Sequence, residues 1–395
     1  MLKPFSDRVS GLQPSAIREI LKFTADPEVI SFAAGNPAPE AFPVETIAKL
    51  SADIFREEPI NALQYSITEG YPKLREWLKA DLTKKGLFRD GDQVVITSGA
   101  QQAIETTAKI LCNEGDVIIC EDPAFVGSLN AFRSYGVKLV GVPMDDDGMK
   151  PDSLEEALRS NPTTKFIYTI PNFQNPTGRT TTLQRRKEIL ALAEKYGVYI
   201  LEDNPYGALR FEGEDVKSIK ELDEKGSVLY CGTFSKTLAP GLRVGYLLGA
   251  SDVVSKAVVG LQTSTVHTNI WAQAVCAAFL ERTDMDTYLD GLRAVYRRKC
   301  NLMAGGLEKE LPDFISFTHP QGGLFIWATL PDKYDMNAFC KGAVERKVAV
   351  VPGNAFCSDE SAVSHSFRLN FSTPTDEQIE KGVKILGAAA KELLK

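Results

Sequence analysis

The chain has 395 residues, more than one hydrophobic core usually fills, so a large domain and a smaller one are expected. Hydrophobic residues make up 44% of the sequence and charged residues 25%, which is typical of a folded enzyme or binding protein and argues against extensive disorder. The formal net charge of -7 argues against nucleic acid or an anionic membrane as the main partner, because no basic excess exists.

Targeting and metal-binding signals are weak. The first twenty residues contain no apolar signal region, and no run approaches the roughly 20 apolar residues that span a bilayer, so a cytoplasmic protein is expected. Seven cysteines without a CxxC pair predict reduced thiols. Three widely spaced histidines predict no metal site.

Short apolar runs alternate with helical patterns from about residue 93 to 248. Runs that are apolar throughout are typical of strands covered on both faces, which favours an α/β fold with a mostly parallel sheet. The predicted strands are 93–97, 116–121, 138–142, 166–171, 198–203, 228–233 and 244–249. Helices are predicted at 100–111, after Ser98 or Gly99, and from Thr181 or Thr182 to Gly197.

A second, smaller α+β unit follows a long helical stretch predicted near 270–310. Its strands are predicted at 322–330, 348–353 and 366–372, and its last helix at 376–394. The expected organisation is an N-terminal segment (1–40) that packs near the small domain and the active site, a large domain (41–285) and a small domain (286–395).

Polar side chains follow five of the predicted strands where each strand ends. In an open parallel sheet, ligands bind outside these carboxyl ends, so the side chains should converge on one crevice. They are Ser98 to Gln102, Asp122 to Phe125, Asn172 to Gly178, Asp203 with Tyr206, and Ser235 with Lys236.

Each of these residues also has an ordinary structural interpretation. Gly99 can form a simple turn, Asp203 can cap a helix, and Lys236 can reach the surface along its apolar stem. Together, however, they supply an anion clamp, an aromatic plate, a buried carboxylate and an amine. This set suits a flat, phosphorylated heteroaromatic cofactor that bears an aldehyde.

Each group has a predicted role toward such a cofactor. The amides after Ser98 would hold its phosphate by helix-terminus and charge-assisted hydrogen bonds, with side chains from a later segment. Lys236 would form a Schiff base. The other phosphate contacts are Thr233, Ser235 and Arg243; Phe125 would stack on the ring, Asp203 would keep the ring nitrogen protonated, and Asn175 and Tyr206 would bind a phenolate oxygen.

The run "TFSKTLAPGLRVG" resembles the signature of the fold-type I aminotransferases of class I/II that depend on pyridoxal 5'-phosphate (PLP), in the branch of 2-aminoadipate and kynurenine aminotransferases. The resemblance continues through "ISFAAGNPAPEAFP", "LQYSITEGYPKLREWL", "PNFQNPTG", "LEDNPYG", "QGGLFIW", "VPGNAF" and "FRLNFS". It implies a large domain with a seven-stranded, mainly parallel sheet, a small domain, and a homodimer with shared active sites.

The resemblance also assigns residues that patterning alone does not. Tyr65 matches the tyrosine that reaches the cofactor phosphate of the neighbouring subunit. Arg368 matches the arginine that grips the substrate α-carboxylate as a bidentate fork, and Gly35 lies in a substrate-binding segment. Asn175 would contact both cofactor and substrate. The phosphate loop would contain Gly99, Ala100 and Gln101; Ala100 and Thr233 each replace a serine frequent in relatives, and Phe125 replaces a tyrosine.

The implied reaction is ping-pong transamination. Lys236 would move the substrate α-proton to the cofactor's C4′ carbon, with Asp203 and Tyr206 as further catalytic residues. Donors of the 2-aminoadipate, aromatic or branched-chain type are expected, with 2-oxoglutarate as acceptor. Arg18 is predicted to meet a distal substrate carboxylate; the alternative is an exposed helix charge paired with Glu19.

Two rival functions share the scaffold. A PLP-dependent β-lyase or decarboxylase would use the same first step. The ligand-sensing domain of a transcriptional regulator would need an additional winged helix of roughly 60–70 residues. We expect no such module, because the aminotransferase pattern has begun by residue 30.

Overall fold

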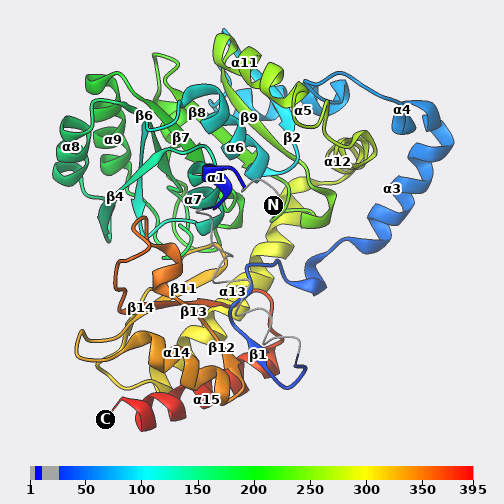
Figure 1. Ribbon diagram of the computed structural model, residues 1–395. Coiled ribbons are helices and arrows are strands. Elements are labelled where there is room, and N and C mark those ends of the chain that lie inside the picture. The colour runs from blue at the N-terminus through cyan, green and yellow to red at the C-terminus, as the bar shows by residue number, and fades with distance from the viewer. Residues whose placement is uncertain (1–4, 11–25, 395) are drawn as a thin grey trace, which may run out of the picture.

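A computed structural model describes residues 5–10 and 26–394. Its largest element is an eight-stranded sheet with the order β2-β9-β8-β7-β6-β3-β4-β5 (Figure 1). All neighbours from β8 to β4 are parallel, whereas β9 runs antiparallel to both of its neighbours. The strands are β2 (Asp92–Thr97), β3 (Val117–Asp122), β4 (Lys138–Asp145), β5 (Gly148–Met149), β6 (Thr164–Thr169), β7 (Tyr199–Asp203), β8 (Val228–Thr233) and β9 (Gly245–Ala250).

The sheet has one strand more than the seven that the sequence predicts. The seven predicted runs form β2, β3, β4, β6, β7, β8 and β9, and the mainly parallel α/β architecture is confirmed. The eighth strand, β5, has only two residues and pairs with β4 as an antiparallel hairpin. Two residues carry no periodicity, so patterning could not have found this strand.

Helices cover both faces of the sheet, as the apolar strands predict. Along β3, Ile118 and Cys120 belong to one core cluster, and Val117 and Ile119 to another. Alternate residues of a strand point to opposite faces, so both faces of β3 are buried. The helices before and around this sheet are α1 (Asp7–Ser10), α3 (Val44–Glu57), α4 (Pro59–Leu63), α5 (Pro72–Lys84), α6 (Ala100–Leu111), α7 (Val126–Arg133), α8 (Pro151–Ser160), α9 (Leu183–Tyr196), α10 (Ile219–Leu222) and α11 (Ser251–Gln262).

The helical stretch predicted near 270–310 is two helices, α12 (Ile270–Arg282) and α13 (Met285–Glu310). The predicted helical stretch is confirmed, with a break at residues 283–284 that the pattern did not indicate. Asp284 separates the two, because its carboxylate accepts hydrogen bonds from the backbone N–H groups of Asp286 and Thr287 and so caps α13. From this cap, α13 runs from the large sheet toward the smaller unit (Figure 1).

The smaller unit contains a four-stranded antiparallel sheet of order β10-β11-β14-β13. A short strand from the N-terminal part, β1 (Ile30–Ser31), pairs in parallel with β12 (Val348–Ala349) beside it. The remaining elements are β10 (Ser316–Phe317), β11 (Phe325–Thr329), β13 (Val351–Pro352), β14 (Ser366–Asn370), α14 (Met336–Glu345) and α15 (Asp376–Leu393). The domain boundaries at 41 and 286 remain a prediction.

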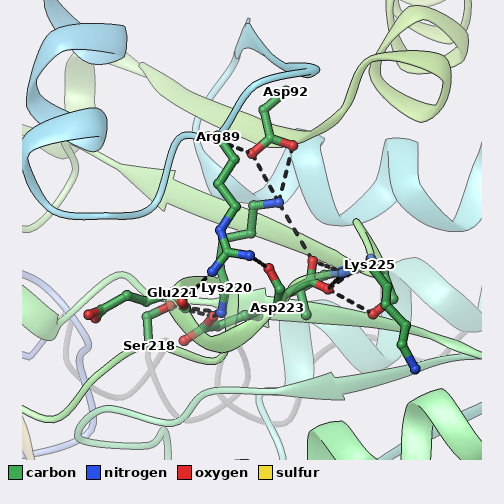
Figure 2. A network of polar contacts seen from close by, with 10 residues as sticks. Arg89, Asp92, Ser218, Lys220, Glu221, Asp223 and Lys225 are labelled. Carbon is green, nitrogen blue, oxygen red and sulfur yellow. Dashed lines mark hydrogen bonds and ion pairs between the residues drawn. The ribbon is translucent and has the colours of Figure 1, made fainter.

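Opposite the carboxyl ends of the parallel strands, a buried ion network joins the starts of β2 and β8 (Figure 2). The Lys220 ammonium lies 3.1 Å from an Asp92 oxygen and 3.7 Å from an Asp223 oxygen, and all three side chains are almost fully buried. Asp223 also accepts a hydrogen bond from the backbone of Val228, the first residue of β8. This edge of the sheet is thus held by paired charges.

Within residues 5–10 and 26–394, no helix combines the length and the apolar content that crossing a membrane requires.

Candidate active site

The residues that follow β2, β6, β7 and β8 meet at the carboxyl-end edge of the large sheet, as predicted. Arg243 Nη2 donates to the Ser98 carbonyl at 2.7 Å, which joins the segment after β8 to the end of β2. Tyr168, on β6, donates its hydroxyl proton to Asp203 at the end of β7 at 2.8 Å. These contacts join the four strand ends in two pairs, and the two pairs are adjacent because β7 lies beside β8 in the sheet.

A cluster of hydrogen-bond donors lies around the start of α6. Gly99 is the N-cap residue with φ 76°, and a Cβ atom there would lie 2.5 Å from Arg243 Nη2, so only glycine leaves room for the guanidinium. The Ser235 hydroxyl lies 3.5 Å from Arg243 Nη1 and accepts a hydrogen bond from Thr233. The free N–H groups of α6, which starts at Ala100, add positive potential beside these donors.

Among the residues that the structure describes, Arg243 and Lys236 have no acidic side chain within ion-pair distance; their polar contacts are a hydroxyl and two backbone carbonyls. Lys236 Nζ instead donates to the Gly35 carbonyl at 2.8 Å. Burial, followed by repulsion from Arg368 and Arg243, lowers the pKa of Lys236 to about 8, which makes the neutral, nucleophilic amine accessible near physiological pH.

A buried carboxylate with one free oxygen lies at the end of β7. Asp203 is 2% exposed; its Oδ2 accepts from Tyr168, whereas Oδ1 has no hydrogen-bond partner among the described residues. Burial raises the pKa of Asp203 to about 7. An unsatisfied buried acceptor is costly, so Oδ1 is a strong candidate for contact with a ligand that carries a donor.

A buried guanidinium on β14 contacts the residues that follow β6. Arg368, which is 2% exposed on β14, donates from Nη1 to Asn175 Oδ1 and from Nη2 to the Ala33 carbonyl, both at 2.8 Å. The guanidinium carbon lies 4.2 Å from the ring centroid of Phe325 and 5.0 Å from that of Phe356. Burial lowers the pKa of Arg368 to about 10, yet the group still carries its charge at neutral pH.

Three further predicted residues lie around these groups. Tyr206 is 4% exposed and packs edge-on against Phe325 at 5.9 Å between ring centroids, and burial raises its pKa. Phe125 lies next to the start of α6, because a Cβ atom on Gly127 would touch both its ring and the Gln101 amide. Gln101 in turn donates to the Gly127 carbonyl at 2.8 Å.

Two predicted residues stand outside this cluster. Tyr65 is 81% exposed and contacts the His267 ring edge-on, with 5.9 Å between the ring centroids, so it lies at the surface. Arg18, the predicted side-chain selector, lies outside the described residues.

Comparison with known proteins decides the family. The model of the aminotransferase class I and II family matches residues 27–386. The chain belongs to the class I and II aminotransferases. It is 39% identical to aromatic-amino-acid aminotransferase 1 of Thermococcus litoralis, covering 100% of this chain and 95% of that protein. It is 37% identical to the 2-aminoadipate transaminase of Thermus thermophilus, covering 99% and 97%.

Solved aminotransferase structures have the same fold. The crystal structure of Pyrococcus horikoshii kynurenine aminotransferase in complex with PMP superposes with a TM-score of 0.95 at 37% identity, covering 99% of this chain and 98% of that one. This aminotransferase therefore has fold type I and is a PLP-dependent enzyme, as the sequence predicts.

Sequence reasoning missed two buried residues of the aminotransferase site. Tyr168 binds Asp203 and accepts from Ser128 at 2.7 Å, so it orients the carboxylate. Glu121 is a wholly buried carboxylate near the end of β3. A signal was present for both, since a tyrosine or a glutamate within an apolar strand must find a polar partner when buried.

Proposed function

We propose that this aminotransferase transfers the amino group of a 2-aminoadipate, aromatic or branched-chain L-amino acid to 2-oxoglutarate. The observation that carries the proposal is the clamp of Arg368 and Asn175, a buried cation without a carboxylate partner among the described residues. Such a cation suits the α-carboxylate that every amino acid and 2-oxo acid presents. The names of two relatives supply the aromatic and 2-aminoadipate classes. The branched-chain class is supported by a solved 2-aminoadipate aminotransferase structure that holds a phosphopyridoxyl-leucine.

The residues present fit PLP. The unpartnered Oδ1 of Asp203 would accept a hydrogen bond from the N–H of a protonated pyridine ring, which is the donor that this buried atom lacks. The cradle that Gly99 leaves beside Arg243 suits a phosphate, with Thr233, Ser235 and the first amides of α6 as further donors. Phe125 would stack on the ring, and Tyr206 with Asn175 would bind its phenolate oxygen.

When bound, PLP withdraws electrons from the amino acid and so makes its α-proton acidic. The chain's own groups then perform the remaining tasks. Arg368 orients the substrate through its carboxylate, and Asp203 keeps the ring nitrogen protonated. Lys236 Nζ would remove the α-proton and donate it to the cofactor's C4′ carbon, a role that a pKa of about 8 allows because the amine both accepts and releases a proton near neutral pH.

We also propose that the enzyme is a homodimer in which Tyr65 contacts the cofactor phosphate of the neighbouring subunit. Several large apolar side chains are exposed from α4 to the following turn and on the nearby segment before α12: Ile60, Leu63, Tyr65, Ile67 and Val266. A contiguous exposed apolar surface favours association with a second copy. Mass measurement in solution tests this; a monomer at micromolar concentration would contradict it.

A panel of amino donors assayed against 2-oxoglutarate tests the function. We expect turnover with 2-aminoadipate and with large apolar or aromatic donors. Absence of turnover with every donor would contradict the proposal, and release of pyruvate and ammonia from a β-substituted donor would indicate a lyase. Arg18→Ala should lower kcat/KM for acidic donors more than for aromatic ones; an equal loss would remove Arg18 from side-chain selection.

A further inference from the structure

Glu121 is a wholly buried carboxylate that none of the steps above uses. It lies one residue before the end of β3 and is 0% exposed. Three donors satisfy it: the Thr169 hydroxyl on Oε1, and both the backbone N–H of Ile170 at 3.2 Å and the Gln174 amide at 3.1 Å on Oε2. The side chain therefore joins β3 to the residues that follow β6.

Gln174 has only one orientation that fits its neighbours. Its Oε1 accepts from the backbone N–H of Thr177 at 2.9 Å and from the Thr177 hydroxyl at 2.7 Å. A backbone N–H can only donate, so the Gln174 Nε2 group must face Glu121 and the Pro123 carbonyl, 2.7 Å away. Every polar atom of this buried amide thus has a defined partner.

The turn held by Gln174 carries Asn175. Gly178 N–H donates to the Gln174 carbonyl at 2.6 Å, and Gln174 N–H donates to the Arg179 carbonyl at 2.8 Å, which closes the turn over 174–179. Asn175 lies inside it and accepts from Arg368 at 2.8 Å. A displacement of Gln174 would therefore move the Asn175 amide relative to the guanidinium.

We infer that Glu121 is a positioning residue: through Gln174 it fixes the turn that places Asn175 on Arg368, and so sets the affinity for the substrate carboxylate. The inference rests on the function proposed above for Arg368 and Asn175. It assigns the effect to hydrogen-bond geometry and not to the negative charge of Glu121.

Geometry and charge can be separated by Glu121→Gln. A glutamine oxygen in the place of Oε2 would still accept from Ile170 N–H and Gln174 Nε2. Its amide nitrogen would donate to the Thr169 hydroxyl, which can accept as well as donate. The substitution removes the charge and keeps the three contacts, whereas Glu121→Ala removes all three.

The chain offers a matched control in Glu202, on β7. This carboxylate is also 0% exposed and also accepts three hydrogen bonds, from the Ser218 hydroxyl at 2.6 Å and from the backbone N–H groups of Ile219 at 3.2 Å and Lys220 at 2.8 Å. Its partners lie at the start of α10 and not in the turn over 174–179. Glu202→Ala should cost similar stability without displacing Asn175.

The experiment measures three quantities for the PLP-loaded variants: melting temperature, donor KM and kcat, and the dissociation constant of 3-phenylpropionate, a carboxylate without an amino group, by calorimetry. For Glu121→Ala we expect roughly a 10- to 100-fold rise in both KM and the dissociation constant, the effect of losing a hydrogen bond to a charged group. Glu121→Gln should change the KM and the dissociation constant by less than about threefold each. Glu202→Ala should lower the melting temperature and leave both constants unchanged.

Each other pattern overturns the inference. Equal changes in KM for Glu121→Ala and Glu202→Ala would show a general loss of stability, and equal changes for Glu121→Ala and Glu121→Gln would show an effect of charge. If Glu121→Ala does not fold, Thr177→Val removes one hydroxyl contact to Gln174 and should still raise the dissociation constant about threefold; no change would contradict the inference. Because 3-phenylpropionate binding needs no turnover, wild-type binding without any transamination would separate failure of the proposed function from failure of this inference.

Discussion

Buried cations are paired differently at the two ends of the parallel strands of the large sheet. At the edge where the parallel strands begin, Lys220 is 1% exposed and lies between Asp92 and Asp223 (Figure 2). At the edge where they end, Arg368 is 2% exposed and, among the described residues, contacts only an amide, a carbonyl and two aromatic rings. Where the strands begin, carboxylates of the same chain pair with the buried cation. Where they end, the positive charge has no described carboxylate partner and is therefore a candidate for binding anionic ligands.

The amine of Lys236 gives the largest expected effect at the ligand-binding edge. Lys236→Ala should reduce transamination by roughly 10³-fold or more, since it removes the proton-transfer group, and should abolish the absorbance of covalently attached PLP. Lys187→Ala, on the exposed face of α9, serves as the control and should leave both unchanged. An unchanged absorbance spectrum in Lys236→Ala would remove this residue from the cofactor site.

Substitutions in the ion network of Lys220, Asp92 and Asp223 should lower the stability of the protein and leave its catalytic activity unchanged. Lys220→Met leaves Asp92 and Asp223 buried without their cation, so the free energy of unfolding should fall by about 3–5 kcal/mol in urea titrations. Lys195→Met breaks an exposed ion pair with Glu155 and should change the free energy of unfolding by less than about 1 kcal/mol. Similar losses in the two variants would mean that burial does not distinguish these ion pairs.

Arg368→Met should mainly impair substrate binding, whereas Lys220→Met should mainly lower stability. No described carboxylate depends on Arg368, so the substitution leaves no buried charge unpaired and removes only the donor of two buried acceptors. The melting temperature of the cofactor-free variant should therefore fall much less than that of Lys220→Met. The KM for amino donors should increase roughly 100-fold, as two charge-assisted contacts to the substrate carboxylate are lost. A large loss of stability at unchanged KM would assign Arg368 to the structure and break the contrast between the edges.

The smallest expected effect concerns pH. The pKa of Lys236 is lowered to about 8, so the neutral amine is a minor form at pH 7 and the major form at pH 9. The rate of covalent PLP capture by cofactor-free enzyme should rise about tenfold between these values and level off above them, because only the neutral amine is a nucleophile. Stopped-flow absorbance measures it; a rate that continues to rise up to pH 10.5 would indicate an ordinary lysine.

The sequence predicted which segments form strands better than it predicted the contacts between those strands. Ser98, Asp203 and Lys236 could be assigned to one site because each follows an apolar run, and parallel strands end at the same edge. The partner of Asp203 could not be predicted, because Tyr168 lies 35 residues away in sequence. Its contact with the carboxylate depends on the order of the strands in the sheet. The break between α12 and α13 was missed although Asp284 offers a standard cap, because the flanking helical pattern outweighed one residue.

The clamp and the site lysine both depend on backbone carbonyls that lie just after β1. Ala33 accepts from Arg368, 335 residues away in sequence, and Gly35 accepts from Lys236, 201 residues away. Within the part of the chain that the structure describes, the strand before them, β1, pairs only with β12 (Val348–Ala349). During synthesis on the ribosome, the segment of residues 30–35 therefore cannot complete these contacts until residue 368 has been made, so this part of the site should form late in folding.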